Sequence, residues 1–281
     1  MSGIETVRTV SELRARIAAW RGDGHSVGLV PTMGGLHEGH LSLVRLSLQQ
    51  TDRTCVTLFV NPKQFGEGED FDVYPRNETA DAMMLAAEGA HLLYAPEVSE
   101  MYPQGSSAQV SVSGLGDILE GEFRPGFFTG VATVVTKLLL QSMPDTAFFG
   151  EKDYQQLLVI RRLVRDLNIP VGVAGGPIVR EADGLALSSR NAYLTPDERQ
   201  TAPVLFKTLT EMAATISSGR PIQEQQEKAV AALAGAGFGP VDYVTVRDAE
   251  TLAPLGAPGR PARILAAAKL GRTRLIDNVA L

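Results

Sequence analysis

Val30-Pro31-Thr32-Met33-Gly34-Gly35-Leu36-His37-Glu38-Gly39-His40 joins a strand-like run at 25–30 to a helix-like run at 41–48. Its three glycines, at positions 34, 35 and 39, remove side chains that would keep the backbone away from phosphate oxygens. His37 and His40 are three residues apart, so a helix that begins near Gly39 carries both on one side of its first turn. There the unpaired N–H groups and the helix dipole favour an anion. The stretch therefore predicts a nucleotide-binding loop between a strand and a helix.

Two other interpretations of this loop are weaker. In the first, the histidines only cap a helix or fill a core, and the flanking strand and helix argue against it. In the second, the histidines bind zinc. The zinc-binding H-E-x-x-H pattern places its histidines four apart, however, and the chain has a single cysteine, Cys55, to complete another kind of zinc site.

The composition predicts a soluble globular protein. The 281 residues are enough for about two domains, and a hydrophobic content of 44% can fill a core in each. The net charge of −6 argues against nucleic acid as a partner, because that affinity rests on clustered Lys and Arg. We interpret the cluster Arg161, Arg162 and Arg165 as a solvated helix face.

The sequence also predicts a cytoplasmic protein without a membrane partner. Cys55 lies in an apolar run and has no second cysteine to pair with, which is typical of a reducing compartment. The N-terminus is charged and lacks the apolar segment of a signal peptide. No run of about eighteen apolar residues, the length that spans a bilayer, occurs in the chain.

Strand-like and helix-like runs alternate through the first part of the chain, which is typical of an α/β protein with a doubly wound parallel sheet. The run at 54–60 is almost continuously apolar, as expected of a strand covered by helices on both faces. We predict strands at 25–30, 54–60, 91–95, 146–149 and 170–174, with helices from about 40, 77 and 154 and a central apolar helix at 131–140.

The pattern changes near Gly175-Gly176-Pro177, where we predict a hinge between a first domain, 1–177, and a second, smaller α+β domain, 178–281. The second domain is predicted to hold a loop ending at Asn191, helices near 196–218 and 222–235, and strands near 241–247, 262–268 and 273–279.

Polar clusters follow three predicted strands directly: the loop to His40, the segment 61–65 and the segment 150–156. In an open parallel sheet, ligands bind beyond the carboxyl ends of the strands, so these clusters are predicted to converge. Lys152 suits a phosphate contact, although a helix-start lysine can also simply face water. Gln64 and Gln156 offer neutral donors and acceptors for a hydroxyl or carboxylate.

A fourth cluster, Leu187-Ser188-Ser189-Arg190-Asn191, lies just past the predicted hinge. Two hydroxyls and a guanidinium within three residues can clamp an anion, and we interpret the segment as part of a lid supplied by the second domain. The alternative is an ordinary polar loop.

Together these segments resemble the pantothenate synthetase (pantoate–β-alanine ligase) family of the HxGH nucleotidyltransferase superfamily. The resemblance covers nearly the whole chain, and its motifs are specific in combination and in order: VPTMGGLHEGHLSLV, FVNPKQF, YPR, FFGEKDYQQL and VREADGLALSSRNAYL. It implies a Rossmann-like nucleotide- and pantoate-binding domain with a smaller C-terminal lid domain, in a homodimer.

The resemblance also implies roles for particular residues. It makes His40 the principal catalytic residue, with His37 and Lys152 assisting, and makes Gln64 and Gln156 contacts of the small substrates. The apolar walls that it implies for the gem-dimethyl group of pantoate are Val131, Val134, Val135, Leu138 and Phe149. The ATP contacts that it implies are Met33, Gly34, Gly35, Leu36, His37, Glu38, Gly39, His40, Gly150, Glu151, Lys152, Asp153, Val179, Leu187, Ser188, Ser189 and Arg190.

The implied reaction joins (R)-pantoate to β-alanine through a pantoyl adenylate. ATP is the substrate as its Mg²⁺ complex, and AMP and pyrophosphate are released. No tightly bound cofactor is implied, and the sequence assigns no Mg²⁺ ligand. Two positions depart from the family pattern. Leu187 stands where Met is frequent, a volume-conserving change, and Phe127 stands where His is common, which puts a polar role of that site in doubt.

The sequence leaves three alternative functions open. A simple nucleotidyltransferase would join AMP to a phosphate and should show extra basic residues for the second anion. A nucleotide-binding module would lack chemistry altogether. A fragment of a tRNA synthetase is disfavoured by the acidic charge and by the missing anticodon-binding domain.

Overall fold

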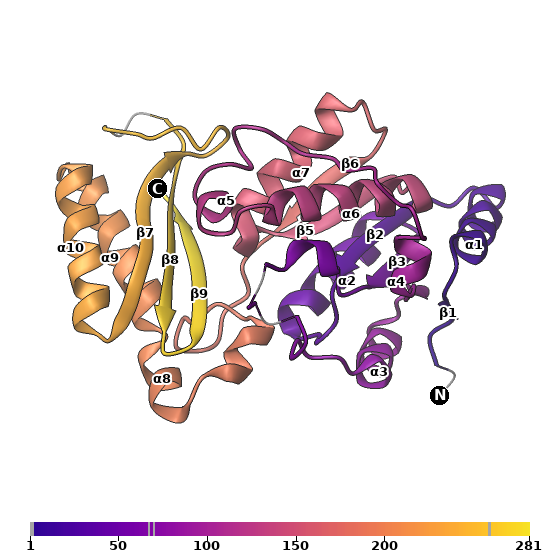
Figure 1. The fold of residues 1–281 in the computed structure, drawn as a ribbon, viewed down its shortest axis with the longest axis horizontal. Helices are drawn as coiled ribbons and strands as arrows, with labels where there is room; N and C mark the ends of the chain where they lie inside the picture. Colours follow the sequence, from indigo (N-terminus) through magenta and orange to yellow (C-terminus); the bar gives the residue numbers. More distant parts are fainter. Residues whose placement is uncertain (1–2, 67, 70, 258–259) are drawn as a thin grey trace. The chain divides into compact units, whose positions relative to one another are not determined.

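The computed structural model describes residues 3–66, 68–69, 71–257 and 260–281. The chain divides into two units, one of Met1–Glu151 with Gln156–Pro177 and one of Lys152–Gln155 with Ile178–Leu281. The first unit holds a six-stranded parallel sheet in the order β1-β4-β3-β2-β5-β6 (Figure 1). Its strands are β1 (Thr6–Val7), β2 (Val27–Thr32), β3 (Arg53–Leu58), β4 (Leu92–Tyr94), β5 (Thr146–Gly150) and β6 (Gly172–Gly176).

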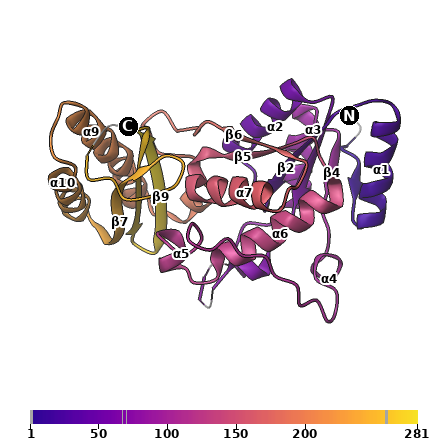
Figure 2. The same ribbon diagram turned by 90° about the horizontal axis from the view of Figure 1, so that it is seen from above.

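Helices connect these strands and cover the sheet on both faces (Figure 2). They are α1 (Val10–Gly22), α2 (Glu38–Gln50), the 3₁₀ helix η1 (Pro62–Gln64), α3 (Glu78–Glu88), α4 (Val98–Met101), α5 (Glu120–Phe123), α6 (Phe127–Ser142), the 3₁₀ helix η2 (Glu151–Asp153) and α7 (Tyr154–Asp166). Helices α2 and α3 lie on one face, and α1 and α6 lie on the other (Figure 2). None of the helices in the described ranges is long and apolar enough to cross a membrane.

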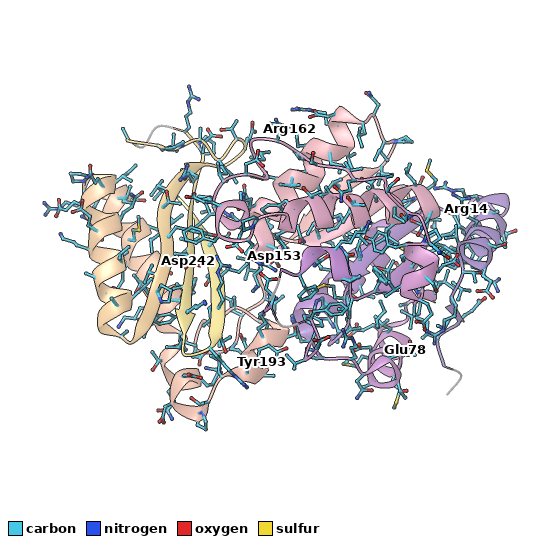
Figure 3. The ribbon with its side chains drawn as sticks, viewed as in Figure 1. Arg14, Glu78, Asp153, Arg162, Tyr193 and Asp242 are labelled. Atoms are coloured by element: carbon cyan, nitrogen blue, oxygen red, sulfur yellow. The ribbon has the colours of Figure 1, made fainter. Side chains whose placement is uncertain are left out.

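The strands of the parallel sheet are apolar in sequence because their side chains lie in the core. Val30, Val56 and Phe148 are fully buried under α2 and α3, because both faces of a parallel sheet exclude water. Cys55 on β3 is also fully buried, and burial raises the pKa of its thiol to about 12. The arginine cluster belongs to α7, where Arg161 and Arg165 are exposed, and Figure 3 labels Arg162 on the same helix.

The second unit packs two helices against an antiparallel sheet in the order β7-β8-β9 (Figure 1). Leu209, Leu233 and Ile264 are fully buried in the core between them. Its elements are the 3₁₀ helix η3 (Ser189–Tyr193), α8 (Pro196–Thr201), α9 (Val204–Ser217), α10 (Ile222–Gly235), β7 (Phe238–Asp248), β8 (Ala262–Leu270) and β9 (Thr273–Ala280).

The structure confirms the predicted class, a Rossmann-like doubly wound parallel sheet with a smaller α+β part. Each predicted strand and helix is present near its expected bounds, except that the run predicted as helical at 196–218 is divided by a turn at 202–203 into two helices, α8 and α9. The sequence interpretation did not include β1 and α1. Strand β1 has only two residues, and α1 starts at a capping box in which Thr9 and Glu12 bond each other's backbone N–H groups.

Candidate active site

Three loops lie next to one another at the carboxyl edge of the parallel sheet. Strand β2 pairs with β3 on one side and with β5 on the other, and the connections reverse direction between β2 and β5. This is the switch point at which open parallel sheets bind ligands. The His37–His40 loop follows β2, the turn Asn61–Gln64 follows β3, and Gly150 ends β5.

The two histidines of the loop are held by hydrogen bonds to the backbone. The N–H of Gly39 donates to Nδ1 of His37 at 3.1 Å, and the N–H of His37 donates to Nδ1 of His40 at 3.3 Å. The rings lie 4.1 Å apart between centroids. Because each Nδ1 accepts a hydrogen bond, a neutral ring carries its proton on Nε2, which gives two N–H donors at the first turn of α2.

A buried carboxylate fixes the glycine turn before these histidines. Asp81 of α3 is 1% exposed and accepts the N–H groups of Gly35 at 3.0 Å and Leu36 at 2.9 Å. Gly34 has a φ of +92°, and a Cβ there would lie 3.2 Å from the Asp81 carboxylate. The position therefore requires glycine for both conformation and space. Asp81 could not be predicted from the sequence, because an acidic residue in the first turn of a helix is ordinary.

The turn after β3 holds the side chain of Gln64 against the loop after β2. Gln64 is buried, its Nε2 lies 3.0 Å from Sδ of Met33, and its Oε1 accepts from Asn61 Nδ2 at 3.1 Å. Asn61 also donates to the carbonyl of Gly130 at 3.1 Å and accepts from the hydroxyl of Tyr102 at 2.8 Å. The structure thus brings Met33 and Gln64 together, as the sequence analysis predicted for these two segments.

A pocket of about 340 Å³ lies beside this turn, and its charged lining residues are Lys63, Glu69 and Arg124. Lys63 and Arg124 both line it, and Lys63 Nζ lies 4.3 Å from the centre of the Tyr102 ring. Arg124 donates to Glu69 at 2.7 and 2.5 Å, and its guanidinium lies 3.8 Å from the Phe127 ring centre. The residue that departs from the family pattern therefore supports an arginine by cation–π contact.

Helix α6 packs on the turn at η1. Val131, Val134, Val135 and Leu138 of α6 are buried, as is Phe149 of β5. These are the five side chains expected to wall the gem-dimethyl group. Gln156 lies in the first turn of α7, and its position on that helix does not by itself fix its role.

Glu151 follows Gly150 in the first unit, and the remaining predicted ATP contacts belong to the second unit. A bridge between Arg180 and Ala186 brings the two ends of this loop together, with the N–H of Leu187 bound to the carbonyl of Val179 at 3.0 Å. Ser188 caps the short helix η3, which contains Ser189 and Arg190. Lys152 and Asp153 belong to the same unit, and Figure 3 labels Asp153.

Metal-binding side chains are not clustered in the part of the chain that the structure describes. Within the described ranges, no three His, Cys, Asp or Glu side chains are grouped to hold an ion. Mg²⁺ in nucleotide sites is commonly bound by substrate phosphates and water with one or two carboxylates.

The strand order and the HxGH loop at the switch point define a class, the Rossmann-like nucleotide-binding α/β proteins. Within that class, the model of the family "Pantoate-beta-alanine ligase" matches residues 5–280. The chain belongs to this family of ligases.

Relatives at high identity support the assignment. A pantothenate synthetase of Paramagnetospirillum magneticum is 58% identical over 278 residues, covering 99% of this chain and 98% of the relative. One from Rhodospirillum rubrum is 56% identical over 280 residues, covering 99% of each.

Two solved structures extend the comparison to the fold. Pantothenate synthetase from Thermus thermophilus superposes with a TM-score of 0.93 at 47% identity, over 98% of this chain and 99% of that one. Pantoate-beta-alanine ligase from Francisella tularensis, complexed with beta-gamma ATP and beta-alanine, gives 0.81 at 31% identity, over 99% and 97%.

Proposed function

We propose that this chain condenses (R)-pantoate with β-alanine to form pantothenate, at the expense of ATP. In the first step the pantoate carboxylate attacks the α-phosphorus, and the bond to pyrophosphate breaks. In the second step the β-alanine amine attacks the acyl carbon of pantoyl adenylate, loses a proton and releases AMP. The observation that carries the proposal is the pair of Nδ1-anchored histidines at the switch point of a chain of this family.

The first step needs no nucleophile from the protein, because the pantoate carboxylate is already one. What the protein must supply is alignment, and stabilisation of the charge that builds on phosphate oxygens. His40 is assigned the principal role, as an Nε2–H donor to the α-phosphate, with His37 and Lys152 as further donors. The other ATP contacts are the residues named above from Met33 to Arg190.

The two small substrates are assigned to the turn after β3 and its surroundings. Gln64 meets pantoate and β-alanine in turn, because its amide can both donate and accept. Its present partners, Met33 and Asn61, hold the amide in a buried position where an added carboxylate or hydroxyl would find it preoriented. Gln156 is assigned a second pantoate contact, and the α6 side chains the apolar wall.

ATP enters as its Mg²⁺ complex, because Mg²⁺ in nucleotide sites is commonly held by substrate phosphates and water. Residues 1–177 serve as the nucleotide- and pantoate-binding domain and 178–281 as the lid. The protein works as a homodimer in the cytoplasm, on small molecules, without nucleic acid or membrane. The acidic net charge of −6 supports the exclusion of nucleic acid.

The experiment that tests this function is exchange of labelled pyrophosphate into ATP with a panel of carboxylic acids. We expect exchange to require pantoate and to be independent of β-alanine and RNA, because adenylate formation precedes the amine. Exchange supported equally by unrelated acids would contradict the substrate assignment. Absence of exchange, with ATP still bound, would reduce the protein to a nucleotide-binding module.

The His40→Ala variant tests the assignment of the loop. Loss of one preorganised donor to a developing charge should lower adenylate formation by about 10²–10³-fold. The melting temperature should stay near that of the parent, since a half-buried side chain in the first turn of α2 contributes little to the core. As the control, pantoyl adenylate supplied ready-made should be converted with a much smaller defect. Equal losses in both half-reactions would assign His40 to general organisation of the pocket.

A further inference from the structure

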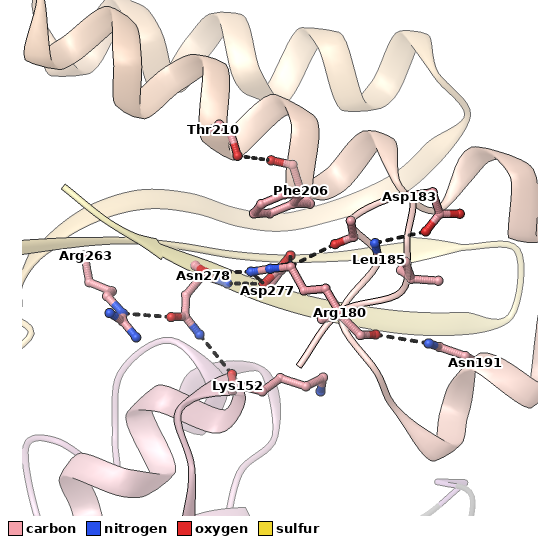
Figure 4. A network of polar contacts seen from close by, with 12 residues as sticks. Lys152, Arg180, Asp183, Leu185, Asn191, Phe206, Thr210, Arg263, Asp277 and Asn278 are labelled. Atoms are coloured by element: carbon pink, nitrogen blue, oxygen red, sulfur yellow. Dashed lines mark hydrogen bonds and ion pairs between the residues drawn. The ribbon is translucent and has the colours of Figure 1, made fainter. Parts of the chain in front are cut away.

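The last strand of the chain, β9, contacts the segment that carries Lys152. Asn278 of β9 is 2% exposed, and its Nδ2 donates to the backbone carbonyl of Lys152 at 3.0 Å (Figure 4). Its Oδ1 accepts from Nε of Arg263 at 2.7 Å. The Asn278 amide is therefore oriented through its oxygen and holds the Lys152 backbone through its nitrogen.

Two further contacts fix the same segment. The guanidinium of Arg263 lies 4.1 Å from the centre of the Tyr154 ring, and the Tyr154 hydroxyl donates to the carbonyl of Ala249 at 2.8 Å. Lys152 and Tyr154 are thus both tied to the antiparallel sheet. This explains why Lys152–Gln155 groups with the second unit, although the chain places it directly after β5.

The neighbouring residue of β9 holds the other proposed phosphate-binding loop. Asp277, 4% exposed, accepts from Arg180 at 2.6 and 2.8 Å, and Arg180 also donates to the carbonyl of Gly184 at 3.1 Å (Figure 4). Arg180 lies 3.7 Å from the Phe206 ring centre, which packs the guanidinium from one side. Two consecutive residues of one strand thus anchor both segments.

We propose that Asn278 is a positioning residue for ATP, acting through Lys152. This inference rests on the proposed role of Lys152 as a phosphate contact. A lysine is a point charge on a flexible four-carbon stem, so its aim depends on where its backbone is held. In Figure 4 the Lys152 side chain extends away from the carbonyl that Asn278 binds, so the hydrogen bond fixes the stem and leaves the ammonium outside it.

A double-mutant cycle on Asn278 and Lys152 tests the proposal, with pyrophosphate exchange as the assay. Asn278→Ala alone should raise the KM for ATP about tenfold, because a buried carbonyl loses its partner and the segment shifts. In the Lys152→Ala background the same substitution should change the KM for ATP by less than about twofold, because residues that act through one another are not additive.

Different outcomes would contradict the positioning role of Asn278 and the phosphate role of Lys152. Equal effects of Asn278→Ala in both backgrounds, or no effect on the KM for ATP in the parent, would overturn the positioning role. An unimpaired Lys152→Ala variant would instead overturn the phosphate role of Lys152, and with it the basis of the inference.

Two further variants serve as comparison and control. Tyr154→Phe removes the hydrogen bond from the Tyr154 hydroxyl to Ala249 without opening the core. It should therefore also raise the KM for ATP. It replaces Asn278→Ala in the cycle if that variant fails to fold. Gln226→Ala removes another side-chain bond to the backbone of the same sheet, from the N–H of Val246 at 3.0 Å, and should leave the KM for ATP unchanged. A rise for Gln226→Ala equal to that for Asn278→Ala would overturn the proposal by assigning the effect to the sheet as a whole.

Discussion

Asp81 is a single carboxylate whose removal should loosen the nucleotide loop. The two carboxylate oxygens of Asp81 accept the N–H groups of Gly35 and Leu36, whereas the amide in Asp81→Asn has only one acceptor oxygen. One buried hydrogen bond is therefore lost. We expect the free energy of unfolding to fall by about 1–3 kcal/mol and the KM for ATP to rise about tenfold. Chemical denaturation and pyrophosphate exchange measure the two effects.

Glu78 on the same helix provides the matched control for Asp81. It forms a surface ion pair with Arg8, with side-chain exposures of 41% and 48%, and such pairs contribute little. Glu78→Gln should therefore change neither quantity appreciably. If Asp81→Asn behaves like Glu78→Gln, the carboxylate does not shape the loop.

His91 should make the stability of the first unit depend on pH. Its Nδ1 accepts from the N–H of Thr54 at 3.1 Å, and its ring packs edge-on against Trp20. Burial, and then the charges of Arg53 and His25, lower the pKa of His91 below its ordinary value. The unfolded state therefore takes up a proton first as the pH falls.

The sign of this linkage favours the folded state at neutral pH. The free energy of unfolding should decrease as the pH falls through about 6.5 towards the lower pKa of the folded state. We expect His91→Gln to show a smaller loss of melting temperature between about pH 7.5 and 5.5 than the parent. An equal loss in parent and variant would show that groups other than His91 carry the acid sensitivity.

Single residues were predictable from the sequence where they belong to a local motif. His37 and His40 could be found because their spacing and the surrounding glycines are local signals. Asp81, Arg124 and Asn278 act through partners far away in the chain, so nothing in their immediate neighbours marks them. Their positions became visible only when the fold brought the partners together.

At the level of elements, helix α6 packs so closely on η1 that a single methyl group should disturb the substrate turn. A Cβ at Gly130 would lie 2.1 Å from the carbonyl oxygen of Lys63 and 2.8 Å from Cα of Gln64. Gly130→Ala should cost about 1–3 kcal/mol of stability by overpacking and should raise the KM for pantoate by displacing Gln64. Denaturation and steady-state kinetics measure both.

Gly235 is the appropriate comparison for Gly130, since it ends helix α10 and a Cβ built there meets no atom of the described residues within 4 Å. Alanine there should be neutral or stabilise by about 0.4–1 kcal/mol through the unfolded chain. A Gly130→Ala variant as stable and active as Gly235→Ala would mean that α6 and η1 can separate at little cost.

The elements were predictable to the extent that their signals are periodic. Strands of the parallel sheet are continuous apolar runs because helices cover both faces, and such runs are easily recognised. Strand β1, with two residues, is too short for a pattern, and the buried side chains of α1 are Leu13, Ile17 and Trp20. Strand β1 therefore depends on tertiary packing, whereas the capping box and the helical spacing of the buried residues of α1 are local signals that the prediction did not use.

For the whole molecule, the homodimer implied by the family is directly testable. Light scattering of the purified protein should give twice the chain mass of 30.0 kDa, at concentrations used for assays. The physical reason is that obligate and stable dimers bury enough surface to persist on dilution. A fully active species of 30.0 kDa would contradict the dimer and leave the proposed chemistry untouched.

The organisation of the whole chain was predicted well in class and less well in detail. The change of pattern near Gly175 marks the change from parallel to antiparallel sheet, which hydrophobic periodicity can reveal. That Lys152–Gln155 groups with the C-terminal unit was not foreseen, because the hydrogen bond from Asn278 joins residues 126 positions apart. No local property of the sequence encodes such a contact.

The buried thiol of β3 makes the rate of cysteine labelling a measure of how often the parallel sheet opens. Cys55 has no exposed surface, and its raised pKa leaves almost no thiolate at neutral pH, so an alkylating reagent reacts only after the surrounding sheet has opened. Because the chain has one cysteine, each labelling event reports opening of the six-stranded sheet and not of the antiparallel sheet. Labelling rates with and without ATP would thus measure how often the first unit opens under native conditions, and whether ATP changes that frequency.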